Sequence, residues 1–255
     1  MKIQILSDLH LEGGIPSWLQ NFKAIGDVLV LAGDIVNARN ISSLNLFNSH
    51  DLGVPVIYVL GNHEYYKGNY PETKDAIREY ISEERLGITL LDNEIADLIF
   101  NGEKVRFIGA TLWSTVSPLD EGDVSKYIAD FRGMIGDRSV LQHNMNGEFS
   151  RGLIKYYLED ANREDVDKIV VVTHFPPSWQ AQEERFKSSG MGSYFFNNMD
   201  DMILDLEPNL WIYGHSHGNL RFKIGKTPVE CNQMGYLGAR EPCLLTFNPH
   251  YCVEI

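Results

Sequence analysis

The stretch Val28-Leu29-Val30-Leu31-Ala32-Gly33-Asp34 joins five consecutive apolar residues to a glycine and a carboxylate. A short apolar run without a polar position predicts a strand that is covered on both faces, as in parallel sheets. A second run, Ile169-Val170-Val171-Val172, leads in the same way to Thr173 and His174. Both stretches therefore predict a buried strand whose end presents a group able to bind a metal ion.

Further β-rich runs and two helix-like stretches surround these two strands. The predicted strands are Lys2–Ser7, Val28–Ala32, Val56–Leu60, Val105–Ala110, Lys168–Thr173, Leu210–Tyr213, Pro228–Asn232, Leu244–Asn248 and Tyr251–Ile255. The predicted helices are Tyr70–Arg85, entered at Pro71, and Phe149–Asn162, capped by Ser150. Strands alternating with helices, then mostly strands, indicate an α/β sandwich of two packed sheets flanked by helices. We expect residues 1–255 to form a single domain.

The bulk composition limits the classes of function. The chain has 255 residues and a net charge of −13, from 22 basic and 35 acidic residues. An acidic surface disfavours binding of nucleic acid, because phosphate-backbone contacts depend on Lys and Arg. There is no apolar run long enough to span a membrane and no signal-peptide core, so we expect a cytoplasmic protein. The three cysteines, with no C-x-x-C pair, are expected to be free thiols.

Five short motifs carry residues that can bind metal ions. They are Asp8-Leu9-His10, Gly33-Asp34, Gly61-Asn62-His63-Glu64, Thr173-His174 and Gly214-His215-Ser216-His217. Each motif follows a predicted strand, and ligands of open α/β sheets bind outside the carboxyl ends of the strands. Singly, each motif has an ordinary structural explanation, such as a turn or a core histidine. Together they predict one cluster of carboxylates, imidazoles and an amide at a single edge of the fold.

This mixture of nitrogen and oxygen ligands suits Mn, Fe or Zn better than Ca. Two such ions, roughly 3.5–4 Å apart, can clamp a phosphoryl group and generate hydroxide at neutral pH. We therefore expect two divalent metal ions, with Mn as the leading candidate and Fe or Zn as alternatives. The glycines at 33, 61 and 214 are expected to let the backbone turn tightly beside each ligand.

The ordered set of motifs resembles the calcineurin-like metallophosphoesterase family. The resemblance implies a four-layer double β-sandwich in which Asp8, His10 and His217 bind the first metal and Asp34 bridges. It implies that Asn62, His174 and His215 bind the second metal, with His63 unligated near the leaving group. It also implies attack on phosphorus by a metal-bridging hydroxide, with Asp34 and His63 as the catalytic residues and Asn62 and His63 close to the substrate.

One departure from the family pattern follows the bridging carboxylate. In the serine/threonine protein phosphatases of the family, an Asp three residues later orients the catalytic His, and an Arg follows it. This chain has Asn37 and Ala38 at those positions, with Arg39 one position further on. A protein phosphatase is therefore not expected. The stretches Ile108–Trp113, His174–Ser178 and Cys231–Tyr236 resemble the small bacterial and phage phosphoesterases of the family instead.

Two segments outside the motifs are candidates for shaping the site. Residues 114–148, rich in Gly, Asp and Asn, form either a solvated excursion or a cap whose Arg132 or Arg138 reaches phosphate. Residues 188–198 contain Phe195 and Phe196, which either pack in the core or stack on a nucleobase.

The predicted function is a metal-dependent phosphoesterase that hydrolyses phosphomonoesters or phosphodiesters, including nucleotides or cyclic nucleotides. The expected partner is a small phosphorylated substrate, with no membrane and no protein partner. A metallonuclease is the alternative within the same chemistry. A non-catalytic scaffold on the same fold is a third reading, although such a protein would be expected to lack some of these ligands.

Overall fold

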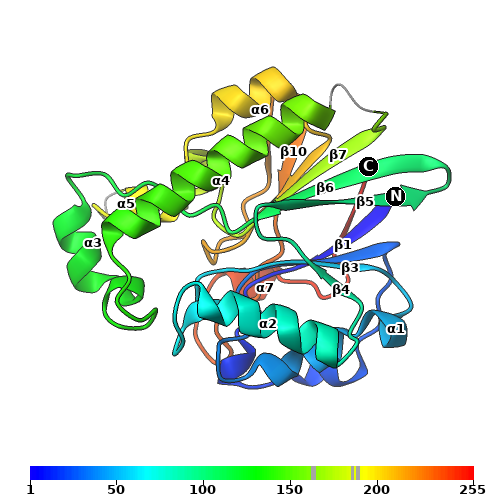
Figure 1. Ribbon diagram of the computed structural model, residues 1–255, viewed down its shortest axis with the longest axis horizontal. Coiled ribbons are helices and arrows are strands. Elements are labelled where there is room, and N and C mark those ends of the chain that lie inside the picture. The colour runs from blue at the N-terminus through cyan, green and yellow to red at the C-terminus, as the bar shows by residue number, and fades with distance from the viewer. Residues whose placement is uncertain (162–164, 185–186, 188–189) are drawn as a thin grey trace.

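The computed structural model shows two mixed β-sheets that lie face to face between helices (Figure 1). It describes residues 1–161, 165–184, 187 and 190–255. The first sheet has the order β11-β1-β2-β3-β4, and the second has the order β5-β6-β7-β8-β10-β9. The predicted α/β sandwich of two sheets flanked by helices is therefore confirmed.

Parallel strands form the middle of each sheet. The edge strands β11, β5 and β9 are antiparallel to their neighbours, whereas the edge strand β4 is parallel to β3. The first sheet contains β1 (Lys2–Leu6), β2 (Val28–Ala32), β3 (Val56–Val59), β4 (Ile88–Leu90) and β11 (Cys252–Glu254). The second contains β5 (Glu94–Phe100), β6 (Glu103–Ala110), β7 (Lys168–Thr173), β8 (Leu210–Ile212), β9 (Phe222–Ile224) and β10 (Thr227–Glu230). Because β11 pairs with β1, the two ends of the chain lie side by side (Figure 1).

Three apolar cores explain why the central strands have no polar face. Along β2, Val28 and Val30 lie in the core between the two sheets, whereas Leu29 and Leu31 face the helices outside the first sheet. The strand β7 divides in the same way, with Val170 on the inter-sheet side. Alternate side chains of a strand point to opposite faces. A sheet covered on both sides therefore needs the continuous apolar runs seen in the sequence.

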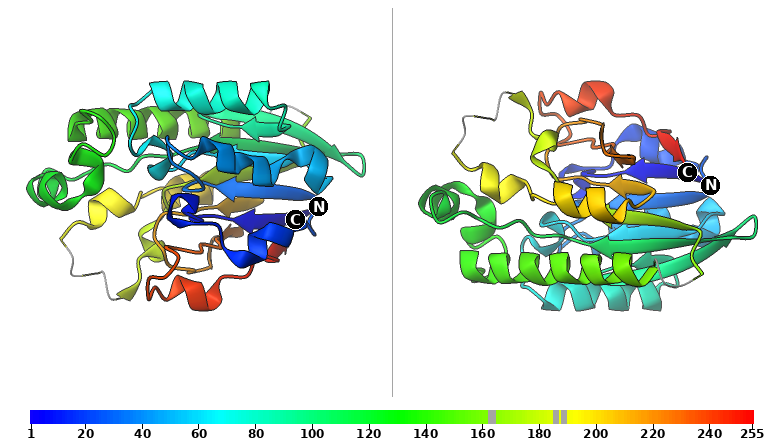
Figure 2. Two further views of the ribbon diagram at one scale, coloured as in Figure 1. Left: turned by 90° about the horizontal axis from the view of Figure 1, so that it is seen from below. Right: turned by 90° about the horizontal axis from the view of Figure 1, so that it is seen from above.

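The helices form the two outer layers of the sandwich (Figure 1). The α-helices are α1 (Ser49–Leu52), α2 (Glu72–Glu83), α3 (Glu121–Tyr127), α4 (Val140–Ala161), α5 (Gly192–Phe195), α6 (Asp200–Leu206) and α7 (Cys243–Thr246). The 3₁₀ turns are η1 (Leu11–Gly13), η2 (Ser17–Asn21), η3 (Ile41–Phe47), η4 (His63–Tyr65), η5 (Ala129–Phe131) and η6 (Trp179–Ala181). The helix α2 covers the first sheet, and α4 and α6 cover the second (Figures 1 and 2).

The segment between β6 and α4 extends beyond the sheets, at the end opposite the chain termini, and carries α3 (Figures 1 and 2). The short helix α5 lies near it (Figure 1). The parallel strands end on this side, so both segments lie where ligands of an α/β sheet are expected.

Two predictions about individual elements are wrong. The predicted strand Leu244–Asn248 overlaps the one-turn helix α7, which follows Pro242 at a helical φ of −61°. The predicted cap Ser150 is a buried residue in the middle of α4, which begins ten residues earlier at Val140. Asn162, the predicted end of that helix, lies outside the described residues. The predicted helix Tyr70–Arg85 is confirmed as α2, and Pro71 immediately precedes it.

Two further expectations from the sequence can be compared with the structure. All three cysteines are free thiols, as predicted. The described helices are all too short or too polar to cross a bilayer.

Candidate metal centre and active site

The five motifs converge at the carboxyl ends of five parallel strands. Asp8 follows β1, Asp34 follows β2, Asn62 follows β3, His174 follows β7 and His215 follows β8. All five side chains belong to buried residues. The two sheets therefore contribute ligands to the same place, as the positions of the motifs after strands predicted.

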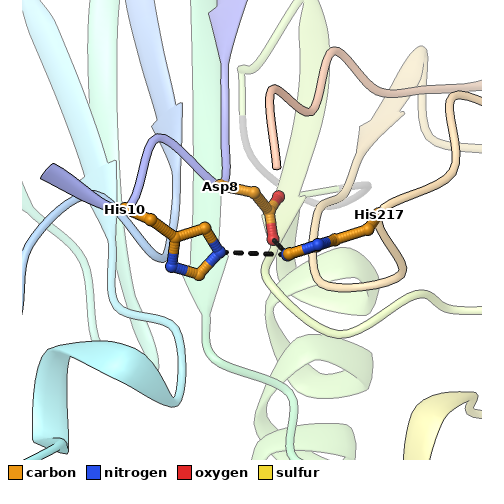
Figure 3. A group of neighbouring side chains, drawn as sticks. All are labelled: Asp8, His10 and His217. Atoms are coloured by element: carbon orange, nitrogen blue, oxygen red, sulfur yellow. Dashed lines mark hydrogen bonds and ion pairs between the residues drawn. The ribbon is translucent and has the colours of Figure 1, made fainter. Parts of the chain in front are cut away.

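One group of possible ligands joins the first and the last motif. Figure 3 shows the His10 and His217 rings pointing toward each other, with the Asp8 carboxylate beside them. The Nε2 atoms of the two histidines are 3.0 Å apart, and His217 Nε2 is 3.5 Å from Asp8 Oδ1. Two imidazole nitrogens and a carboxylate oxygen directed at one point are an arrangement that binds a divalent cation.

A second group lies beside the first. Asp34, His174 and His215 each offer a ligand atom within 4.8 Å of the others. The Asn62 amide oxygen is 3.2 Å from both His174 Nε2 and His215 Nδ1. The two oxygens of Asp34 face different groups, since Oδ1 is 3.3 Å from His174 Nε2 and Oδ2 is 3.9 Å from His10 Nε2. Asp34 therefore lies between the two ligand groups.

The buried groups of the site fit a pair of cations. His215 Nδ1 and the Asn62 amide oxygen lie 3.2 Å apart beside Asp34 and His174, so one metal ion could bind both atoms. Burial, followed by the charge of His174, lowers the pKa of His215 well below its usual value. This keeps the imidazole in the neutral form that metal binding requires.

The charges of the second group also fit a cation. Burial raises the pKa of Asp34, but the charges of His174 and His63 outweigh it and hold that pKa well below its usual range. Burial lowers the pKa of His174, but the charge of Asp34 raises it by more, so that the pKa is about 9. An ion pair between these two side chains thus holds the carboxylate ionised, and a bound cation would replace the proton on His174.

Strained backbone is concentrated at the ligands. Asp8, His10, Asp34, His215 and His217 all have φ between 45° and 70°. Residues other than glycine rarely adopt this conformation, which costs on the order of 1–3 kcal/mol each where it is strained. Each of these residues re-aims its side chain at the point where a strand ends. Five such residues at one place are typical of a functional site.

The glycines beside the ligands are required chiefly for space. Gly33 has a φ of 87°, a backbone conformation that favours glycine, so the tight turn predicted at this residue is confirmed. Gly61 and Gly214 do not have positive φ. A Cβ on Gly61 would collide with Asp34 Oδ1, and one on Gly214 would collide with the Ser7 hydroxyl and with Asp8. At these two positions the glycine therefore makes room for a carboxylate ligand.

A buried glutamate holds two of the motifs together. Glu64 accepts hydrogen bonds from the backbone N–H groups of Asp34, Ile35 and Gly61, at 2.9, 2.7 and 2.6 Å. The hydroxyl of Tyr58 donates a further bond at 2.7 Å. Glu64 thus fixes the loop that carries Asp34 relative to the Asn62-His63 turn.

The candidate catalytic histidine has a carboxylate partner that the sequence did not reveal. Asn37 cannot supply the carboxylate expected three residues after Asp34, but Glu12 Oε1 lies 3.0 Å from His63 Nδ1. Glu12 Oε1 is also 3.2 Å from His10 Nδ1. Arg39, the suggested replacement for the missing arginine, is exposed and does not border the site cavity. The only sequence indication of Glu12 is its place two residues after His10.

Electrostatics favour the charged form of His63. Burial lowers the pKa of His63, but Asp34 and then the hydrogen bond to Glu12 raise it by more, so that it lies above its usual value. Burial raises the pKa of Glu12, whereas its hydrogen bonds to His10 and His63 bring it down to about 2. The other nitrogen, His63 Nε2, is 3.0 Å from the Tyr236 hydroxyl. The ring stacks on Tyr66 with centroids 3.9 Å apart.

A second carboxylate missed by sequence reasoning comes from residues 114–148. Asp130 is buried, and its Oδ1 accepts a 3.0 Å hydrogen bond from Asn62 Nδ2. The hydroxyls of Tyr66 and Tyr194 donate to the same carboxylate at 2.8 and 2.7 Å. Because the amide nitrogen of Asn62 is held by Asp130, its oxygen is directed toward His174 and His215.

The C-terminal part of the chain completes the first ligand group. Glu241 Oε1 is 2.9 Å from His217 Nδ1, the ring nitrogen turned away from Asp8. A carboxylate on the outer nitrogen of a metal-binding histidine fixes its tautomer and orientation. Burial raises the pKa of Glu241, but its hydrogen bond to His217 lowers it below the usual value.

A cavity of about 460 Å³ opens directly over the second ligand group. Its floor includes Asp34, Asn62, His63, His215 and His217. Its remaining lining is mostly aromatic or apolar and includes Tyr66, Tyr127, Ile128, Ala129, Met191, Tyr194, Phe195, Phe196 and Tyr236. All the predicted metal-binding and catalytic side chains therefore lie in or beside one cavity.

The two arginines predicted to reach phosphate do not border this cavity. Arg132 is exposed. Arg138 is 7% exposed, and its guanidinium stacks on Trp113, 3.8 Å from the ring centre, and on Tyr70 at 5.0 Å. The structure thus brings the seven predicted metal ligands and His63 together, but it does not bring either arginine to them.

In the segment 188–198, some aromatic residues pack in the core and another remains available to a ligand. Tyr194 and Phe196 are buried in the apolar cores, as core packing predicted. Phe195 is only partly buried and borders the cavity. Ser188 and Ser189, the first residues of this loop, lie outside the described residues.

Two packed sheets with candidate metal ligands at the strand ends define a class of α/β proteins that can bind metal ions. Comparison with known proteins identifies the family within this class. The sequence profile of the calcineurin-like phosphoesterases matches residues 1–219. The chain belongs to the calcineurin-like phosphoesterase family. Tyr236 and Glu241 lie beyond the matched residues. An uncharacterised protein of Acanthamoeba polyphaga mimivirus is 27% identical to the chain, over 99% of the chain and 96% of that protein.

Solved structures show the same fold. The phosphopantetheinyl hydrolase of Mycobacterium tuberculosis superposes with a TM-score of 0.72 at 17% identity, covering 92% of this chain and 89% of that one. A putative 5'-nucleotidase of Staphylococcus aureus superposes with a TM-score of 0.51 at 16% identity, covering 91% of this chain and 48% of that one. At these identities the likeness concerns the fold, so the reaction must be argued from the site itself.

Proposed function

We propose that this protein is a hydrolase that cleaves phosphomonoesters or phosphodiesters with the help of two divalent metal ions, Mn being the leading candidate. The observation that carries the proposal is the place of Asp34, whose two oxygens face the His10 side and the His174 side of the site. Family membership supports a phosphoester as the substrate. Two bound ions would supply positive charge and an activated water molecule for the reaction.

The chain's own residues would hold and release the ester. Asp8, His10 and His217 would bind one ion, and His174, His215 and the Asn62 oxygen the other, with Asp34 shared. His63 lies beside them with Nδ1 fixed by Glu12, so Nε2 is directed toward the Tyr236 hydroxyl. In this position His63 would donate the Nε2 proton to the leaving oxygen as the phosphorus–oxygen bond of the ester breaks.

Two other functions are less well supported. A metallonuclease would need cationic side chains along a nucleic acid, and the described residues that line the cavity include neither Lys nor Arg. A non-catalytic scaffold would not require seven ligand groups and a carboxylate-bound histidine in one place. A small phosphorylated molecule remains the proposed partner.

The test is a hydrolysis assay on protein supplied with Mn²⁺. Bis(p-nitrophenyl) phosphate, p-nitrophenyl phosphate, nucleotides, cyclic nucleotides and single-stranded DNA form the substrate panel. We expect turnover of small esters that is removed by a chelator and restored by Mn²⁺. Metal-loaded protein that cleaves none of these compounds would refute the proposal, and cleavage of DNA alone would favour the nuclease.

A further inference from the structure

The cavity is lined by two chemically different sets of residues. The floor carries the metal-binding groups and His63, which would hold the phosphoryl group. Six further lining residues, here called the wall, are Tyr127, Ile128 and Ala129 from the excursion, Met191 and Phe195 from the segment around α5, and Tyr236, whose hydroxyl is 3.0 Å from His63 Nε2. None of these six wall residues is charged. The organic part of a bound ester would therefore meet aromatic and apolar side chains.

The wall leaves aromatic surface uncovered. Tyr127 is 55% exposed and Tyr236 is 41% exposed, although both border the cavity. Phe195 is partly buried, and its ring lies 5.5 Å from the ring of His215, so this part of the wall adjoins the metal-binding floor. Exposed aromatic faces around a cavity of this size are suited to a flat ring, which they can cover by stacking or edge contacts.

The cavity has no cationic side chain among its described lining residues that could bind the organic group of the ester. Among the cavity-lining residues in the described part of the chain, the only acidic side chains are Asp34 and Glu241, and there is no Lys or Arg. Arg138 is turned into its stack with Trp113. The described lining therefore offers no salt bridge to a second anionic group of the substrate. Apart from Gln182 and Ser216, its side chains outside the site motifs and Glu241 are aromatic or apolar, so stacking and apolar contacts are the main means of holding the organic end.

The geometry points to a phosphoester whose organic group carries a flat aromatic ring of nucleobase size, held against Tyr127 and Phe195. This assignment deepens the proposed function and rests on it. It gives the excursion at 114–148 a role in substrate selection, because Tyr127 belongs to α3. It also predicts that specificity is determined by residues that supply no metal ligand.

The experiment compares two ligands that differ only in the ring. They are the methylenephosphonate isosteres of adenosine 5'-monophosphate and of ribose 5-phosphate, in which carbon replaces the scissile ester oxygen. Binding to the Mn²⁺-loaded protein is measured by titration calorimetry. One base–aromatic stacking contact corresponds to about a 10-fold change in affinity. We therefore expect the adenosine ligand to bind about 10-fold more tightly or better.

Variants locate the effect on the wall. Tyr127→Ala changes a half-exposed residue and should leave the fold intact, and Phe195→Ala provides a second variant. Each should weaken the adenosine ligand about 10-fold and leave the ribose ligand within about 2-fold. Tyr156→Ala is the matched control, since Tyr156 is 58% exposed on α4 and does not border the cavity. It should leave both affinities unchanged.

Equal affinities of the two ligands would overturn the inference. A large ratio that survives in both wall variants would overturn it as well. Hydrolysis is measured separately on the p-nitrophenyl esters. A protein that cleaves these esters without preferring the adenosine ligand refutes the aromatic subsite alone, whereas one that prefers it but cleaves no ester refutes the proposed function.

Discussion

His63 has a hydrogen-bonding partner at each of its two ring nitrogens. Glu12 lies at Nδ1 and the Tyr236 hydroxyl at Nε2, each at 3.0 Å. This leaves no ring nitrogen for a metal ion and fixes the direction of the proton on Nε2. The missing carboxylate at Asn37 therefore does not leave His63 unsupported, because Glu12 provides one from a different strand end.

The first prediction concerns the role of His63 as an acid. In His63→Gln the metal ligands remain, so the metal content should be unchanged by elemental analysis. Turnover should fall about 100-fold or more for alkyl esters, whose leaving oxygen needs a proton, and less for p-nitrophenyl esters. An equal fall for the two kinds of ester would exclude proton donation and leave only a role in binding the phosphoryl oxygens.

The second prediction concerns Asp34. Replacement by Asn keeps the shape of the side chain but removes the charge and one of the two oxygens that face the ligand groups. We expect the Asp34→Asn variant to bind less metal and to lose at least about 100-fold in kcat/KM, measured at saturating Mn²⁺. Asp51→Asn, a change at an exposed residue of α1, is the control and should behave as the unchanged protein. Full activity of the Asp34→Asn variant would contradict a bridging role.

At the scale of elements, the excursion between β6 and α4 is tied to the metal centre by one carboxylate. Asp130 accepts hydrogen bonds from Asn62, Tyr66 and Tyr194, which come from two other parts of the chain. The loop after β3, the turn η5 and the helix α5 are thereby joined at a buried position. A solvated loop would not place a carboxylate there.

The third prediction follows from this junction. Asp130→Ala removes the acceptor of three buried hydrogen bonds, which costs on the order of 1–3 kcal/mol for each donor left unpaired. It also frees the Asn62 amide to turn its nitrogen toward the metal, so metal affinity should fall about 10- to 100-fold. Urea unfolding and Mn²⁺ titration measure the two effects. Asp123→Ala, an exposed carboxylate of α3, should change neither, and a normal metal affinity in Asp130→Ala would disprove the positioning role.

Strand prediction succeeded where both faces of a strand are buried and missed three of the four edge strands. The apolar runs of β2 and β7 have no alternative to a covered strand. By contrast β5, which has no buried residue, and the three-residue strands β4 and β9 were missed, whereas the edge strand β11 was predicted. Edge strands bury less apolar surface, so their sequences carry a weaker pattern.

At the scale of the whole molecule, the ligand site lowers the free energy of unfolding of the metal-free protein. Five residues at the site have left-handed backbone, and buried carboxylates and imidazoles are gathered close together. The chain as a whole carries a net charge of −13. Bound cations would neutralise part of this charge and would bind only the folded chain, so they should stabilise it.

The fourth prediction is that purified protein contains close to two metal ions per chain and that their removal lowers its melting temperature. Ligand present at 100 times its Kd stabilises the native state by about 2.7 kcal/mol. For a chain of this size that corresponds to a shift of roughly 5–10 °C. The melting temperature is measured with chelator and again after Mn²⁺ is restored. Asp34→Asn should show a smaller shift, and a native protein without metal would refute the assignment.

The sequence by itself determined the two-sheet α/β fold, the seven candidate ligands and His63. It could do so because continuous apolar runs and the motifs that follow them are local patterns. Only the tertiary structure decided that Glu12 supports His63, that Asp130 orients Asn62 and that Glu241 supports His217. It also turned Arg138 away from the cavity and placed aromatic residues in the same cavity as the candidate metal ligands. These contacts join residues far apart in the chain, so no spacing within one motif could predict them.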